Sequence, residues 1–142
     1  MQTSARNQCV GRIVSLKAGP ISAEVTVDLG TGDCITALIT KDSADNLGLK
    51  EGLEVFTLVK ASSVILVAGS DKVKLSARNQ LRGKVIACKR GMINAEVTIQ
   101  LVGNNTVTAL ITNESLDRLA LKEGDTACAI FKAASVIIGV DL

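Results

Sequence analysis

Residues 21–29 (ISAEVTVDL) carry a clear alternation of apolar and polar side chains, with an apolar residue at every second position from Ile21 onward. Because successive side chains of a strand point to opposite faces of its sheet, this period predicts a half-buried β-strand. Residues 9–17 and 34–39 have a similar strand-like mixture, and Gly11 indicates a bulge or bend in the first of them. The first part of the chain is therefore expected to form three strands.

A different pattern follows the third predicted strand. Thr40 can cap a helix N-terminus, so a short helix is expected over residues 41–48. Residues 53–60 and 63–68 are apolar and predict two more strands, while residues 30–33 (GTGD) predict a hairpin turn. Five strands with a short helix between the third and the fourth is the order of a small OB-like barrel. A β-sandwich is the alternative, but it suits a short unit with such a helix less well.

The chain then repeats the whole pattern. Residues 4–8 (SARNQ) return unchanged as residues 76–80, and the correspondence continues without a gap to the C-terminal end. This internal duplication predicts an all-β chain of two tandem OB-like five-stranded barrels, residues 1–70 and 71–142, each with one short helix. Because domains this small bury a modest fraction of their surface, we expect pairing within the chain or assembly between chains.

Composition excludes several classes of function. The chain is 47% hydrophobic and 21% charged, which is typical of globular proteins, and its net charge of +2 is too balanced for a non-specific polyanion binder. It has no His, Trp or Tyr, so the usual general acid–base group and the usual stacking platforms for nucleic acid are missing. Glu24 and Glu96 are the only acids on a strand that both halves keep, and no base or nucleophile lies near them in the sequence. We therefore expect a binding protein and not an enzyme, with an OB-fold nucleic-acid-binding module as the alternative.

The cysteines give no sign of a metal centre. Cys9, Cys34, Cys88 and Cys128 form no C-x-x-C pair, have no zinc-ligand spacing, and do not keep their positions across the repeat. We expect them to be reduced, mostly buried residues, and we expect no directly ligated metal. The chain opens on polar residues, and no apolar run approaches about 20 residues. A cytoplasmic protein without a membrane segment is expected.

Two polar segments in each half carry the candidate chemistry. In the first half these are residues 4–7 (SARN) and 60–62 (KAS). They offer hydroxyl, guanidinium, amide, ammonium and backbone N–H donors, and neither contains a carboxylate, so the combination suits a fully deprotonated anion. The structural alternative is a turn with Arg6 in a surface ion pair and Lys60 as a solvated strand end.

The sequence resembles the molbindins, which are small cytoplasmic molybdate-binding proteins built from Mop domains, and in particular their tandem (di-Mop) members. The resemblance covers essentially the whole chain, and its segments occur in the same order in both halves. They are S-A-R-N at 4–7 and 76–79, A-E-V at 23–25 and 95–97, A-L-I-T at 37–40 and 109–112, L-x-L-x-x-G at 47–52 and 119–124, and K-A-x-S-V-I at 60–65 and 132–137.

This resemblance implies an OB-like barrel for each Mop repeat, with oxyanions bound between subunits where an S-A-R-N segment meets a K-A-S segment. A tandem chain in that arrangement is expected to form a homotrimer for cytoplasmic storage and homeostasis of molybdate or tungstate, with no other cofactor. The implied oxyanion-binding residues are Ser4, Ala5, Arg6, Asn7, Thr40, Lys60, Ala61 and Ser62 in the first half, and Ser76, Ala77, Arg78, Asn79, Thr112, Lys132, Ala133 and Ser135 in the second.

The two halves depart from each other at two positions in these segments. Ala134 stands where the first half has Ser62, so the second half lacks one hydroxyl donor. The family segment G-x-x-N-A-E-V is complete at residues 91–97, whereas Ser22 takes the place of Asn94 in the first half. If this strand lines an axial oxyanion site, Ser22 and Asn94 are its candidate ligands and the two halves would bind differently.

Protonation separates the candidate anions. Molybdate and tungstate are dianions that only accept hydrogen bonds at neutral pH, whereas phosphate still carries a proton that needs an acceptor. A pocket with donors alone would leave that proton unmatched, at a cost of about 1–3 kcal/mol. We therefore expect molybdate and tungstate to bind and phosphate to be rejected, while sulfate must be rejected by its size.

Overall fold

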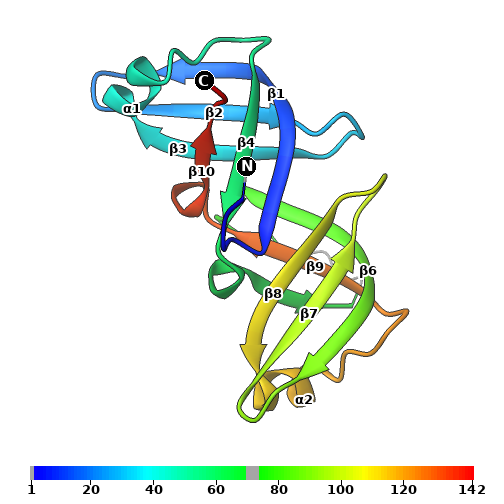
Figure 1. Ribbon diagram of the computed structural model, residues 1–142. Helices are drawn as coiled ribbons and strands as arrows, with labels where there is room; N and C mark the ends of the chain where they lie inside the picture. Colours follow the sequence, from blue (N-terminus) through cyan, green and yellow to red (C-terminus); the bar gives the residue numbers. More distant parts are fainter. Residues whose placement is uncertain (1, 70–73) are drawn as a thin grey trace.

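The computed structural model describes residues 2–69 and 74–142, so the predicted junction between the two halves lies outside the described residues. The first half contains β1 (Asn7–Ala18), β2 (Ser22–Asp28), β3 (Cys34–Thr40), α1 (Lys41–Asn46), β4 (Glu54–Val59), the 3₁₀ turn η1 (Ala61–Ser63) and β5 (Ile65–Ala68). The second half contains β6 (Asn79–Arg90), β7 (Asn94–Gln100), β8 (Thr106–Thr112), α2 (Asn113–Leu119), β9 (Thr126–Phe131), the 3₁₀ turn η2 (Ala133–Ser135) and β10 (Ile137–Gly139). The predicted all-β class and the position of the short helix are confirmed (Figure 1).

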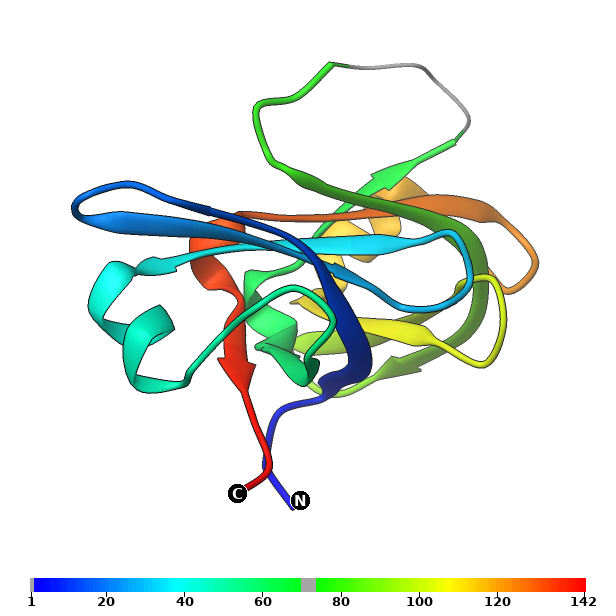
Figure 2. The same cartoon turned by 90° about the horizontal axis from the view of Figure 1, so that it is seen from above.

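The two halves exchange their last strands. One sheet has the order β10-β4-β1-β2-β3 and the other the order β5-β9-β6-β7-β8, so each five-stranded sheet takes one edge strand from the other half. In β10, Ile138 pairs with Thr57 of β4, and in β5, Leu66 pairs with Ala129 of β9. β10, in red, lies beside β4 in Figure 1, and Figure 2 shows it on the same side of the molecule as the helix α1 of the first half. Neither sheet is therefore complete within one sequence repeat.

Packing follows the alternation that the sequence predicts. Ala23, Val25 and Val27 of β2 are fully buried, and the polar residues between them are half-buried. Ile21 departs from the expectation: it precedes the first ladder pair of β2, Ser22 with Thr40, and is 78% exposed. Buried side chains of both halves form one contiguous core, to which the exchanged strands add Leu66 and Ile138. The core therefore joins the two halves.

The predicted irregularity in β1 is present, but it lies after Gly11. The register between β1 and β2 shifts between Ile13 and Ser15. Gly11 itself allows close approach of the strands, because a Cβ atom there would lie 2.5 Å from the carbonyl oxygen of Asp28. The same closeness recurs at Gly83 in the second half, so the close approach of the first two strands requires glycine in both repeats.

All four cysteines are free thiols, as expected, although their burial varies. Cys9 and Cys128 are buried, Cys88 is half-buried and Cys34 is exposed at the start of β3. Burial raises the pKa of the Cys9 thiol, an effect that a hydrogen bond with Thr57 partly offsets. Within residues 2–69 and 74–142, no helix is long and apolar enough to cross a membrane.

Candidate anion-binding site

Strand pairing brings the two polar segments of each half to the same place. Asn7 at the start of β1 pairs with Val59 at the end of β4, and Asn79 pairs with Phe131 in the same way. The S-A-R residues immediately precede these pairs and the Lys-Ala residues immediately follow them. Segments from opposite ends of a repeat therefore meet at neighbouring strand ends within one sheet.

A groove marks this meeting point in the second half. Its volume is about 760 Å³, and Ser76, Ala77 and Arg78 line it together with the run from Lys132 to Ser135. Residues of the first half complete the wall, among them Leu38 of β3, Ser63 of η1 and Ile65 of β5. Ser76, Arg78 and Lys132 are exposed, whereas Ala133 is buried beneath them. The groove thus combines hydroxyl, guanidinium and ammonium donors with apolar walls from both halves.

The arginines have carboxylate partners that lie far away in the sequence. Arg78 donates from Nη1 and Nη2 to the two carboxylate oxygens of Glu24 at 2.8 and 3.0 Å. Arg6 donates from Nη1 to Oε1 of Glu96 at 2.6 Å. These hydrogen bonds hold the pKa of Glu24 and of Glu96 below the usual value for a carboxyl. The expectation of donors without acidic partners is therefore wrong for the arginines, and the surface ion pair considered for Arg6 is present.

The asparagines bind the other half of the chain. Asn79 donates from Nδ2 to the carbonyl of Thr36 at 2.8 Å and accepts from the Thr36 N–H at 2.7 Å. Asn7 makes the same pair of hydrogen bonds with Thr108, at 2.8 and 2.7 Å. Both asparagine side chains are buried. Each amide therefore pairs with a backbone N–H and C=O of the other half's edge strand, β3 or β8. Direct anion binding by these side chains stays a prediction.

The two threonines cap the short helices, as the sequence predicts. Thr40 Oγ1 accepts from the Ser43 N–H at 3.0 Å and donates to Ser43 Oγ at 2.8 Å. Thr112 makes the equivalent contacts with Ser115. In the ladders, Ser22 lies opposite Thr40 and Asn94 lies opposite Thr112, so the two axial candidates occupy corresponding, exposed positions.

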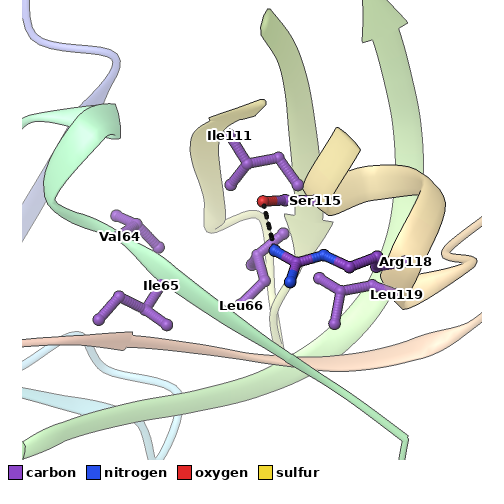
Figure 3. A pocket seen from close by; sticks show the side chains of 7 residues that line it. All are labelled: Val64, Ile65, Leu66, Ile111, Ser115, Arg118 and Leu119. Carbon is purple, nitrogen blue, oxygen red and sulfur yellow. Dashed lines mark hydrogen bonds between the residues drawn. The ribbon is translucent and has the colours of Figure 1, made fainter. Parts of the chain in front are cut away.

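Lys60 and Ser62 are exposed and Ala61 is half-buried, and none of the three lines a second hollow that the structure shows between the halves. It has a volume of about 450 Å³ and lies between Val64, Ile65 and Leu66 of the first half and Ile111, Ser115, Arg118 and Leu119 of the second (Figure 3). Arg118 donates to Ser115 Oγ at 3.5 Å across a largely apolar lining. Because its two walls come from different halves, no local sequence signal points to this hollow.

The described residues hold no cluster of three or more Cys, Asp and Glu side chains arranged for a metal ion. What the arrangement does offer is a set of cationic and hydroxyl donors at paired strand ends, once in each half. An anion with several acceptor oxygens is the ligand that this chemistry suits.

Two β-units in tandem, with donor-rich strand ends that recur in both, define a duplicated small-domain binding protein. The family model of the TOBE domain matches residues 3–66 and again residues 75–138. The chain therefore belongs to the TOBE-domain family, with two Mop-like domains in tandem, and the resemblance seen in its sequence is confirmed.

Individual relatives agree with this assignment. Over 140 residues, or 99% of this chain, the sequence is 47% identical to the molybdenum transport protein ModE of Azotobacter vinelandii. It is 42% identical, over the same share, to the molybdenum-pterin-binding protein MopA of Rhodobacter capsulatus. The chain spans about half the length of these relatives, 52% and 53% respectively. A crystal structure of the cytoplasmic molybdate-binding protein ModG with molybdate bound matches with a TM-score of 0.95 and 44% identity, covering 99% of this chain and 100% of that one.

Proposed function

We propose that this chain binds molybdate or tungstate at the paired strand ends of its two halves and serves to store and buffer these anions in the cytoplasm. The observation that carries the proposal is the groove in which Ser76 and Arg78 lie with Lys132 and Ser135. The likeness to ModG, whose structure contains molybdate, supports the same ligand for this chain.

The donors available fit a tetrahedral dianion. A guanidinium has five N–H groups, so Arg78 keeps three of them after its two hydrogen bonds to Glu24. The Lys132 ammonium and the two serine hydroxyls add further donors. The nearby carboxylate of Glu24 already accepts two hydrogen bonds from Arg78, so it is only a weak acceptor for the proton of phosphate. Selection against phosphate is therefore expected to be strong but not absolute.

The corresponding set in the first half is Ser4, Arg6, Lys60 and Ser62, with the backbone N–H group of Ala61, while the Ala5 N–H already donates to Thr3 Oγ1 at 3.2 Å. Ala134 takes the place of Ser62 in the second half. Asn7 and Asn79 support these sets by fixing the strands, and Thr40 and Thr112 by fixing the helix starts. Ser63 is the counterpart of Ser135, so Ser62 is a hydroxyl that the second half lacks. We expect the first-half site to bind more tightly, because a hydrogen bond to a charged ligand contributes about 1.5–3 kcal/mol.

Assembly into a homotrimer belongs to the same proposal. Leu38 and Ile65 at the groove, and Leu110 and Ile137 at the equivalent positions, are large apolar residues that remain exposed in the single chain. A second copy covering them would also enclose the donor sets. Light scattering should then give about three times the 14.8 kDa chain mass, and a monomer that binds molybdate at full stoichiometry would refute assembly at these sites.

Titration calorimetry tests the ligand. We expect heats for molybdate and tungstate, and a much weaker response to phosphate and sulfate. Lys60→Ala and Lys132→Ala should each weaken one class of site about ten-fold or more, whereas Lys50→Ala, at an exposed turn, should change nothing. Equal heats for phosphate and molybdate, or equal behaviour of all three lysine variants, would refute the proposal.

A further inference from the structure

Two equivalent ion pairs connect the halves next to the candidate sites. Arg78, in the S-A-R segment of the second half, pairs with Glu24 of β2, and Arg6 of the first half pairs with Glu96 of β7. In both pairs the carboxylate comes from the second strand of the other half's sheet. The glutamate side chains are partly shielded, with 28% and 32% of their surface exposed, while the arginines are about half exposed. The repetition of this contact calls for a common role.

The geometry leaves each guanidinium able to bind a second partner. Nη1 and Nη2 of Arg78 each give one hydrogen to Glu24, so the Nε–H and one hydrogen on each Nη remain. Arg78 also lines the groove. A tetrahedral oxyanion can therefore take the free edge formed by Nε–H and one Nη–H while the carboxylate holds the adjacent Nη1–Nη2 end.

The backbone on either side of the pair is already fixed. Asn79, next to Arg78, is tied to Thr36 of β3 by two hydrogen bonds. Leu38, two residues further along β3, lines the groove and lies opposite Glu24 in the ladder. Side chains of such a cross-strand pair share one face of the sheet. With the backbone held, the rotatable side chain of Arg78 is the part of the site left to be placed.

From these contacts we propose that Glu24 and Glu96 are positioning residues of the anion sites. Each carboxylate holds the arginine of the other half with one N–H edge turned to the ligand, so each site depends on both halves of the chain. Glu24 itself is not a ligand of molybdate, since its two oxygens accept from Arg78 and the molybdate dianion has no proton to donate to them. This inference rests on the proposed anion-binding function.

Calorimetry with molybdate tests the inference in an Arg6→Ala background, where the Arg78 site dominates the signal. Glu24→Ala should weaken the affinity about ten-fold, on the order of the cost of ordering one more flexible side chain on binding. Glu24→Gln should recover much of that loss, because its amide oxygen still accepts from the guanidinium. Glu54→Ala is the matched control, since Glu54 is exposed and its contact with Arg12 is long, at 3.8 Å.

Three results would overturn the positioning role. The first is a molybdate affinity of Glu24→Ala equal to that of Glu54→Ala. The second is an affinity of Glu24→Ala tighter than that of its parent protein, which would make Glu24 a competing charge. The third is a loss of affinity on Glu24→Ala that is just as large when Arg78 has already been replaced by alanine. A double-mutant cycle of Glu24 and Arg78 separates the last case from the proposal.

A ligand-free measurement separates this inference from the proposed function. The NMR signal of the Arg78 Nε–H should report an ordered side chain in the wild-type protein and a mobile one in Glu24→Ala. If the wild type gives no heat with molybdate, the proposed function fails and the NMR comparison still decides whether Glu24 fixes Arg78. If molybdate binds but the NMR signal and affinity are unchanged in Glu24→Ala, the positioning role alone fails.

Discussion

Replacing Asn79 with alanine should strongly destabilise the protein, because this side chain closes an edge of the opposite sheet. Asn79 is 1% exposed, and its partner Thr36 is 8% exposed. The substitution removes both hydrogen bonds and leaves the Thr36 N–H and C=O in a place that water reaches poorly. An unsatisfied buried polar group costs about 1–3 kcal/mol, so the two together should cost about 3 kcal/mol.

Thermal and urea unfolding measure this loss. For a chain of this size, 3 kcal/mol corresponds to a decrease in Tm of about 10 °C. Asn104→Ala makes the same chemical change at an exposed position of the β7–β8 loop and should lie within about 0.5 kcal/mol of the wild type. If Asn79→Ala is no more destabilising than Asn104→Ala, the two hydrogen bonds do not hold the edge strand and the reasoning fails.

Asn79→Asp gives a second test of the same contact. The aspartate keeps an acceptor for the Thr36 N–H but, once ionised, cannot donate to the Thr36 carbonyl. Burial without that donor raises its folded-state pKa above the ordinary aspartate value of about 3.9. Compared with the wild type at the same pH, the unfolding free energy of Asn79→Asp should therefore be highest below about pH 3.9. It should fall as pH rises through the folded-state pKa of the aspartate. A pH-independent difference from the wild type would contradict the assigned hydrogen bonds.

Three further predictions concern the fold as a whole. Gly83→Ala should cost about 1–3 kcal/mol in chemical unfolding, because its Cβ would lie 2.2 Å from the Gln100 carbonyl oxygen, whereas Gly19→Ala, with 3.6 Å to its nearest atom, should be tolerated. The Glu24 and Glu96 ion pairs should stabilise the folded protein above the ordinary carboxyl pKa of 4.5, and this stabilisation should be lost as pH falls through their lowered folded-state pKa values. A Glu24→Gln, Glu96→Gln variant whose unfolding free energy falls with acid as steeply as that of the wild type would contradict this. Heat unfolding should be a single transition with equal calorimetric and van't Hoff enthalpies, since each sheet contains strands of both halves; a van't Hoff value near half the calorimetric one would indicate independent units.

Local features of the fold could be predicted because they depend on neighbouring residues. The strand expected over residues 21–29 is observed as Ser22–Asp28, and the Thr40 cap is observed where the polar pattern placed it. Ile21 fits the period of β2 but lies before its first ladder pair, so periodicity alone could not give its exposure. Pattern identifies a strand more reliably than it identifies the strand's ends.

The exchange of edge strands could not be predicted in the same way. β5 and β10 follow nearly identical 3₁₀ turns and carry the same apolar character, so each is locally suited to either sheet. Leu66 and Ile138 enter the common core from the exchanged positions. The choice of partner depends on how the two halves pack against each other, and that is a property of the whole chain.

The candidate site was predicted as two donor segments, and the structure brings those segments together. What the sequence concealed was the partner of each arginine, because Glu24 lies 54 positions from Arg78. Carboxylates are absent within each segment but are supplied by the opposite half. Reading charge segment by segment therefore overestimates the free positive charge of a site that is built from several strands.

Retention of the same residues in both halves now has two physical explanations. Arg78 and Asn79 each contact a residue of the first half, Glu24 and Thr36, and their counterparts Arg6 and Asn7 make the mirrored contacts. A change in any one of them would therefore weaken the junction between the halves, whether or not an anion binds. Lys60 and Lys132 differ in this respect: both are exposed and both follow the last ladder pair of their strands. Repetition of the lysine is consequently the stronger argument for an anion, and the lysine variants are the sharper test of ligand binding, while the arginine and asparagine variants report on ligand and junction together.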